Sequence, residues 1–219
     1  MNTDLARQKQ YWDNTVADFE SIYTHRKSGM QNWLDRVFRS DMYERFEYTM
    51  SHAEPLRDKS VLDVGCGTGQ YAVEFARRGA RRVLGIDIAP NMLEVSRHNV
   101  RAAGCEDRCE FQQSDLLEYR SSETFDVTIG IGLFDYIRDP LPVLRRMHEV
   151  TSGRVIISVP RSNTWRAPVR KARLAMRGCD VYFYSQQRTV DLLQEAGFKN
   201  VDIESVGKLY CATAFVVGP

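Results

Sequence analysis

Hydrophobic residues recur every three or four positions in the first quarter of the chain, a spacing typical of an amphipathic helix. The clearest case runs from Trp33 to Met42, where charged residues occupy the other positions. We expect two helices between residue 4 and about residue 50, separated by the segment Thr24–Gly29. Residues 1–55 are therefore predicted to form an N-terminal helical arm, or cap.

From Lys59 onward the pattern changes to short β-rich runs that alternate with helical ones. The expected strands are Ser60–Val64, Arg82–Ile86, Cys109–Gln112, Phe125–Ile131 and Arg154–Val159. The expected helices are Gln70–Arg78, Ala89–Ala103, Leu141–Val150 and Gln186–Ala196. The chain ends in two further strands that are close enough to pair as an antiparallel hairpin, Lys199–Val206 and Leu209–Val217. This alternation predicts an α/β fold with a mostly parallel sheet and helices on both faces.

Composition fits one soluble domain with decorations, because the chain has 219 residues, of which 43% are hydrophobic. Its net charge of +1 gives no global indication of nucleic-acid or acidic-membrane binding. No apolar run approaches the roughly 18 residues of a membrane span, and the N-terminus lacks the hydrophobic stretch of a secretory signal. Five scattered cysteines without a CxxC pair favour free thiols, so we expect a cytoplasmic protein.

The most informative stretch is VLDVGCGTGQY, from Val61 to Tyr71. A hydrophobic strand leads into three glycines at alternate positions, and a helix is expected to begin directly after them. Glycines allow a sharp turn and a close approach of backbone to ligand, and a helix start offers free N–H groups to an anion. The strand–turn–helix context makes a ligand-binding loop more plausible than a tight turn alone.

Three acidic residues lie near the ends of the first three strands. Asp87 follows the glycine loop by about 20 residues, where a carboxylate can accept hydrogen bonds from both ribose hydroxyls. Asp115 follows the third strand, where it could meet an adenine amino group. Asp63 lies inside the first strand, and we expect it to face the pocket because a buried acid is costly unless it is paired. Each acid alone could equally be a helix cap or a solvated strand end.

These motifs resemble those of the class I S-adenosylmethionine-dependent methyltransferases. The resemblance covers about Val61 to Val159 and rests on VLDVGCGTG, GIDIAPNML and SDLLEY. It implies a Rossmann-like seven-stranded sheet whose last strand is antiparallel, and S-adenosyl-L-methionine as the cofactor. It further implies that the glycine loop lines the methionine part of the cofactor, and that Asp87 holds its ribose. The cofactor-binding residues implied in this core are Asp63, Gly65, Cys66, Gly67, Gly69, Asp87, Ile88, Met92, Ser114, Asp115, Leu116 and Gly130.

A nicotinamide-dependent oxidoreductase is the main alternative. Its GxGxxG fingerprint would place a third glycine at position 70, where this chain has Gln70. Asp63 would also repel a pyrophosphate, whereas it suits the charged amino-acid end of S-adenosylmethionine. A catalytically silent protein that binds S-adenosylmethionine is a third possibility.

Methyl transfer needs alignment of donor and acceptor more than a fixed catalytic residue. In the family resembled, the acceptor approaches the end of the fourth strand, here Gly130–Asp139. Asp135 is therefore a candidate base and Tyr136 a candidate acceptor contact, both counted as catalytic candidates. In the alternative interpretation, Asp135 caps the helix near Pro140 and Tyr136 merely packs.

A basic, aromatic-rich insert at about residues 161–184 interrupts the core, which spans residues 56–219. The insert could close over the pocket as a lid whose arginines bind an anionic acceptor, or it could be a solvated helix held by its aromatic residues. In the first case the substrate-binding residues are Tyr136, Arg161, Arg166, Arg170, Tyr182 and Tyr184.

The N-terminal arm carries aromatic residues that are predicted to cover the cofactor, with Tyr11 as the contact. Its YWD…F…IY pattern is faintly similar to that of magnesium-protoporphyrin O-methyltransferases, whose acceptor loop carries a histidine. Asp135 stands near that place in this chain, and the C-terminal third diverges.

The sequence thus predicts a cytoplasmic S-adenosylmethionine-dependent methyltransferase that acts on an oxygen or nitrogen of a small, possibly anionic molecule. Nucleic acid is not the expected partner, and the sequence leaves the oligomeric state open. No grouping of histidine, cysteine and aspartate has metal-ligand spacing, so no metal is expected.

Overall fold

The computed structural model describes residues 31–121, 123–163 and 180–216, with side chains from residue 42 onward. The first predicted helix of the arm and the middle of the insert lie outside these ranges. The strands are β1 (Ser60–Val64), β2 (Arg82–Asp87), β3 (Cys109–Gln113), β4 (Phe125–Gly130), β5 (Thr151–Pro160), β6 (Lys199–Val206) and β7 (Leu209–Phe215). The helices are α2 (Gln31–Ala53), α3 (Gln70–Arg77), α4 (Pro90–Ala102), α5 (Pro140–Glu149) and α7 (Gln186–Glu195).

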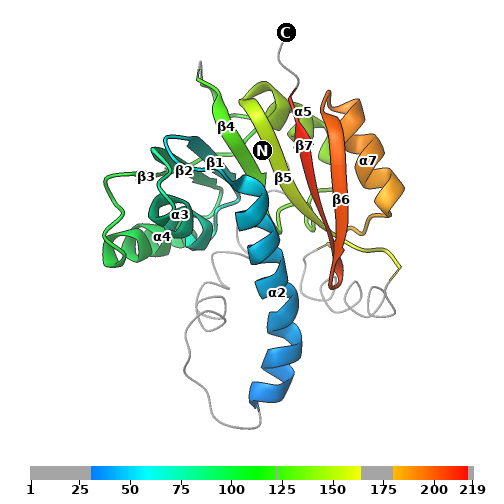
Figure 1. Ribbon diagram of the computed structural model, residues 1–219, viewed down its shortest axis with the longest axis horizontal. Coiled ribbons are helices and arrows are strands. Elements are labelled where there is room, and N and C mark those ends of the chain that lie inside the picture. Colours follow the sequence, from blue (N-terminus) through cyan, green and yellow to red (C-terminus); the bar gives the residue numbers. More distant parts are fainter. Residues whose placement is uncertain (1–30, 122, 164–179, 217–219) are drawn as a thin grey trace.

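The seven strands form one sheet in the order β3-β2-β1-β4-β5-β7-β6 (Figure 1). The pairs among the first five strands of this order are parallel, whereas β7 runs antiparallel to both β5 and β6. The predicted α/β fold, with its Rossmann-like sheet and antiparallel last strand, is therefore confirmed.

Two hydrophobic cores cover the two faces of the sheet. Alternate residues of one strand point to opposite faces, so Leu62 joins the core under α5 and α7, while Val61 joins the core under α2, α3 and α4. Parallel strands buried on both faces read as continuous apolar runs, which is why the sequence shows these strands so clearly.

The strand β5 begins earlier than the predicted Arg154, because its pairing with β4 includes a register shift between Phe125 and Val127. Gly153 makes this shift possible, since a Cβ at that position would collide with the backbone carbonyl of Asp126. The hydroxyl of Thr151, the first residue of β5, forms a hydrogen bond of 2.7 Å with the Thr128 hydroxyl of β4.

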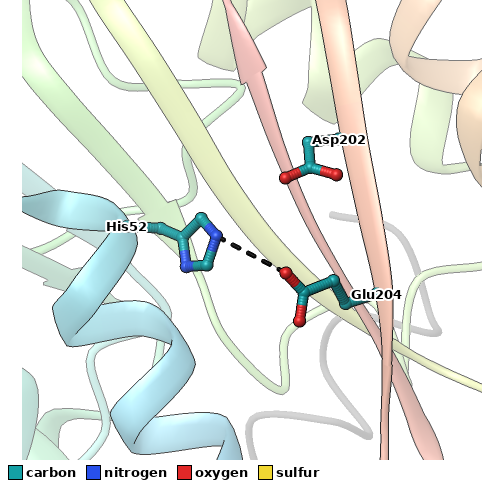
Figure 2. Close-up of side chains that lie close together, drawn as sticks. All are labelled: His52, Asp202 and Glu204. Atoms are coloured by element: carbon teal, nitrogen blue, oxygen red, sulfur yellow. Dashed lines mark ion pairs between the residues drawn. The ribbon is translucent and has the colours of Figure 1, made fainter.

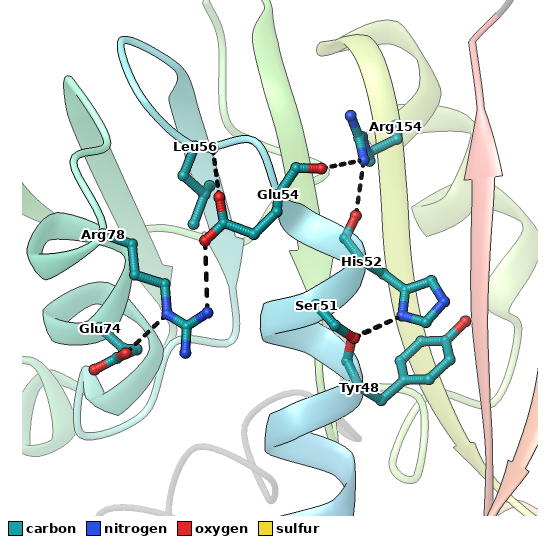
Figure 3. A network of polar contacts seen from close by, with 8 residues as sticks. All are labelled: Tyr48, Ser51, His52, Glu54, Leu56, Glu74, Arg78 and Arg154. Atoms are coloured by element: carbon teal, nitrogen blue, oxygen red, sulfur yellow. Dashed lines mark hydrogen bonds and ion pairs between the residues drawn. The ribbon is translucent and has the colours of Figure 1, made fainter.

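The helix α2 lies against the sheet and is bonded to it at its C-terminal end (Figure 3). The Tyr48 hydroxyl bonds to the Thr213 hydroxyl at 3.1 Å. The Arg154 guanidinium donates to the backbone carbonyls of His52 and Glu54, each at 2.9 Å. The N-terminal half of α2 projects past the carboxyl ends of the parallel strands (Figure 1). No helix within residues 31–121, 123–163 and 180–216 has the length and apolar character required to cross a membrane.

Candidate functional site

The glycine loop connects β1 to α3 at the carboxyl edge of the sheet. Backbone N–H groups of Gly65 and Cys66 donate to the Ile86 carbonyl at 2.8 and 3.1 Å, which fixes the loop against β2. All three loop glycines have positive φ angles, a region that other residues avoid. A Cβ at Gly69 would lie 2.8 Å from the Ser96 Cβ, whereas one at Gly67 would meet nothing within 4 Å. Gly67 therefore borders open space.

Asp87, at the end of β2, holds the tip of this loop. Its carboxylate accepts hydrogen bonds from the backbone N–H groups of Gly67 and Ala89, each at 2.9 Å. A carboxylate has about four acceptor positions, so Asp87 can accept further bonds from a ligand hydroxyl while it keeps both of these.

Asp63 is buried in the middle of this arrangement and is only 2% exposed. Within the described part of the chain, its Oδ2 atom has no hydrogen-bond partner. Burial, together with the nearby charge of Asp87, raises the pKa of Asp63 to about 8. A buried acid of this kind is satisfied by a cationic donor. The residues therefore fit a ligand with an ammonium group, as the amino-acid end of S-adenosylmethionine would provide.

The remaining cofactor candidates lie along the adjacent strand ends. The Ser114 N–H donates to the Asp87 carbonyl at 3.1 Å, which brings the end of β3 beside the end of β2. Met92 and Leu116 are buried, and Ile88 is half-buried. The Asp115 carboxylate accepts from the Leu117 N–H at 3.0 Å, so this acid also closes a local turn.

Two candidates in the predicted cofactor set are enclosed by side chains. The first is Cys66, whose sulfur packs so closely on Gly85 that a Cβ there would lie only 2.8 Å from it. Burial, followed by the charges of Asp63 and Asp87, raises the pKa of the Cys66 thiol. Cys66 is thus a neutral packing residue. A Cβ at Gly130 would meet Phe134 and Met147, so only the backbone of Gly130 is available to a ligand.

The segment that follows β4 carries the predicted acceptor residues. Asp135 is 6% exposed, and its backbone carbonyl accepts from the Tyr182 N–H at 2.8 Å. Tyr136 and Tyr182 are both half-buried. The alternative role of Asp135 as a helix cap is wrong, because Asp139 caps α5 by accepting from the Leu141 N–H.

Tyr184 is hydrogen-bonded to the backbone of this segment. Its hydroxyl donates to the carbonyls of Phe134 and Ile137 at 3.2 and 3.3 Å, and its ring belongs to the hydrophobic core. Burial, and then the charge of Asp135, raises the pKa of Tyr184 above its usual range. This geometry favours a positioning role for Tyr184 over the predicted direct contact with an acceptor.

Arg161, a predicted substrate contact, is bonded to the β6–β7 hairpin. Its Nη1 atom donates to the Gly207 carbonyl at 3.1 Å, and its guanidinium lies 5.1 Å from the centre of the Tyr210 ring. Arg161 thus ties the start of the insert to the β6–β7 hairpin. The other predicted contacts, Arg166, Arg170 and Tyr11, lie outside the described residues.

Arg45 of α2 is a residue that the sequence analysis missed. Its Nη1 atom lies 3.1 Å from the place where a Cβ on Gly132 would be, directly after β4. The Gly132 N–H is in turn bonded to the Ser158 hydroxyl at 2.9 Å. Arg45 precedes the buried Thr49 by one helical turn, so helical spacing alone could have assigned it to the inward face of α2.

Comparison with known proteins decides the family. A model described as "Methyltransferase domain" matches residues 56–202, about two thirds of the chain. The chain belongs to this methyltransferase family. The class I S-adenosylmethionine-dependent methyltransferase identified from the sequence motifs is confirmed, and S-adenosylmethionine is the cofactor of the family.

The relatives differ in the acceptor that their names give. The tRNA U34 carboxymethyltransferase of Vibrio vulnificus is 29% identical over 175 residues, which cover 78% of this chain and 53% of the relative. The ubiquinone biosynthesis O-methyltransferase of Neisseria meningitidis is 39% identical over 104 residues, which cover 46% of this chain and 42% of the relative. The chain thus spans about half the length of these curated relatives.

Among solved structures, the magnesium protoporphyrin IX methyltransferase of Synechocystis PCC 6803 with bound SAH has a similar fold. The two chains superpose with a TM-score of 0.78 at 18% identity, over 95% of this chain and 98% of the other. At this identity the likeness shows the fold alone.

Proposed function

We propose that this methyltransferase transfers a methyl group from S-adenosylmethionine to an oxygen or nitrogen of a small molecule. One observation carries the proposal: a fully buried carboxyl group, Asp63, beside a glycine loop that borders open space at Gly67. The cofactor supplies an activated methyl group on a sulfonium, so the protein needs to hold the two reactants in line and exclude water.

Different residues around the glycine loop bind different parts of the methyl donor, S-adenosylmethionine. Asp63 accepts hydrogen bonds from the amino group, and Asp87 accepts from the ribose hydroxyls while it holds Gly67 in place. Ile88 and Met92 contact the adenine, and Ser114, Asp115 and Leu116 lie at its edge.

The acceptor would bind where the segment after β4 meets α2. Asp135 would take up a proton from the acceptor, with Tyr136 and Tyr182 beside it. Arg45 brings a cation to the neighbouring Gly132, which suits an acceptor with an anionic group. We infer that α2 forms part of a cap over this region, because α2 projects past the strand ends there (Figure 1).

A tRNA nucleoside is the second candidate acceptor, since a tRNA carboxymethyltransferase is among the relatives. The near-neutral net charge of +1 favours the small molecule, because tRNA binding relies on basic surface. We also propose a cytoplasmic location, since Cys66, Cys105, Cys109 and Cys211 are all free thiols.

The donor half of the proposal is tested by calorimetry with S-adenosylhomocysteine and NAD. We expect saturable binding of the first and none of the second, and the reverse would overturn the proposal. A matched variant, Asp63→Asn, should bind S-adenosylhomocysteine at least tenfold more weakly, because an amide cannot pair with an ammonium charge.

The acceptor half is tested by formation of S-adenosylhomocysteine from S-adenosylmethionine. The enzyme is incubated either with a metabolite extract filtered to remove macromolecules or with total tRNA. Turnover only with the extract supports the small-molecule proposal, turnover only with tRNA overturns it, and cofactor binding without turnover on either favours the silent binding protein.

A further inference from the structure

A second group of ionisable side chains lies on the α2 face of the sheet, four strands away from β1 in the sheet order. It consists of His52, in the last turn of α2, with Asp202 and Glu204 of β6 (Figure 2). One imidazole nitrogen and one oxygen of each carboxylate lie within 4.8 Å of one another. These three residues, the His52 cluster, are separate from the glycine loop and from the acceptor region.

The strand geometry directs both carboxylates toward α2. Val201 and Ile203 pack against the core on the opposite face of the sheet, and side chains alternate along a strand. Asp202 and Glu204 therefore share the face that α2 covers, and they are neighbours two residues apart on it.

The imidazole of His52 is held with one nitrogen toward these acids. Its Nδ1 atom lies 2.9 Å from the Tyr48 carbonyl, which can only accept, and 3.1 Å from the Ser51 hydroxyl, which itself donates to that carbonyl, so Nδ1 carries the hydrogen (Figure 3). The Tyr48 ring stacks on the imidazole at 3.8 Å between centroids, and it is fixed in turn by Thr213. In the neutral ring, Nε2 then presents a lone pair toward Glu204. Metal-binding histidines are oriented by the same kind of bond from their other nitrogen to a carbonyl.

The distances within the cluster leave room for an ion. The Nε2 atom of His52 and the Oε1 atom of Glu204 are 3.8 Å apart, which is too long for a hydrogen bond. Among the described residues, no lysine or arginine forms an ion pair with Asp202 or Glu204. Two like charges on one strand face repel each other, and a cation between them would remove that repulsion.

We propose that the His52 cluster binds a divalent transition-metal ion, with Zn²⁺ as the best match. One imidazole nitrogen and two carboxylate oxygens are ligands that Zn²⁺ accepts at about 2.0–2.2 Å, with water completing the site. Binding requires the ligand atoms to approach one another by about 1 Å, given the ligand distances of such sites. The Glu204 side chain is 55% exposed and free to move by this amount.

The ion would join the C-terminal end of α2 to the edge strand of the sheet. Because the same helix projects over the acceptor region, a metal at this place would stabilise the cap without touching the reactants. This role does not depend on the proposed methyl transfer.

The test is a calorimetric titration of the full, untagged protein with Zn²⁺. We expect one ion per chain, and at least tenfold weaker binding in both Asp202→Asn and Glu204→Gln. These two exposed positions are chosen because His52→Gln would also disturb the stacking on Tyr48. The matched control is His98→Gln, an exposed histidine of α4, which should bind Zn²⁺ as the wild type does.

X-ray absorption should show nitrogen and oxygen ligands only, and Zn²⁺ should raise the Tm of the wild type but not of Glu204→Gln. No saturable binding, equal loss in His98→Gln and Glu204→Gln, or sulfur ligands would each overturn the proposal.

Discussion

The two carboxyl groups near the glycine loop, Asp87 and Asp63, have different surroundings. Asp87 receives two backbone N–H bonds and stays available as an acceptor, whereas Asp63 has a raised pKa because it is buried near that charge. The contrast gives each acid a separate part of the proposed donor: Asp87 for neutral hydroxyls and Asp63 for an ammonium group.

Replacing Asp87 by alanine tests the first of these roles. We expect Asp87→Ala to weaken S-adenosylhomocysteine binding more than tenfold in calorimetry, since hydrogen bonds to a charged group contribute about 1.5–3 kcal/mol. Asp107→Ala is the control, because that carboxylate is 71% exposed and remote from the loop. An unchanged affinity in a folded Asp87→Ala protein would refute the ribose assignment.

At the scale of elements, the position of α2 determines what reaches the acceptor region. The helix is bonded to β5 through Arg154 and to β7 through Tyr48, while Glu54 just after it forms an ion pair with Arg78 of the α3 C-cap (Figure 3). These contacts come from three separate parts of the chain, so the position of α2 depends on tertiary packing.

The bond between Tyr48 and Thr213 is the element-scale test. Tyr48→Phe keeps the ring but leaves the buried Thr213 hydroxyl without this partner, which should lower the free energy of unfolding by about 1–3 kcal/mol. Urea unfolding measures the loss. Tyr43→Phe, on the same helix and 67% exposed, should change nothing, and equal effects of the two variants would contradict the docking role.

At the scale of the whole molecule, Asp63 links stability to pH. Its pKa is about 8 in the folded protein, against an ordinary value of 3.8. Between these values the folded protein keeps a proton that the unfolded chain releases. Stability from this group is therefore complete at low pH, and it is lost as the pH rises from about 4 to about 8.

Unfolding of the ligand-free protein at pH 5, 6.5 and 8 measures this link. The wild type should lose stability relative to Asp63→Asn as the pH rises, with a slope of up to about 1.4 kcal/mol per pH unit. Saturating S-adenosylhomocysteine should reduce the slope, because the ammonium group favours the ionised acid. Parallel curves for the two proteins would show that Asp63 is not buried in this way.

The sequence by itself determined the sheet, its mostly parallel order, the glycine loop and the family. These are encoded in local signals: apolar runs that are buried on both faces, glycines at positive φ, and acids at strand ends. Where the structure describes them, the predicted strand and helix ends differ from the observed ones by at most three residues. The difference of three residues at the start of β5 arises because a register shift depends on the partner strand and not on local preference.

Only the tertiary structure decided which side chains share a site. Arg45 of α2 lies beside Gly132, and Tyr184 is bonded to the segment after β4. Arg161 is bonded to the β6–β7 hairpin. His52 lies close to Asp202 and Glu204, which are about 150 residues further along the chain. Local sequence spacing cannot predict such contacts, because they depend on how α2 and the β6–β7 hairpin pack on the sheet. Because its members are not spaced like metal ligands in the sequence, the His52 cluster could not be predicted from the sequence.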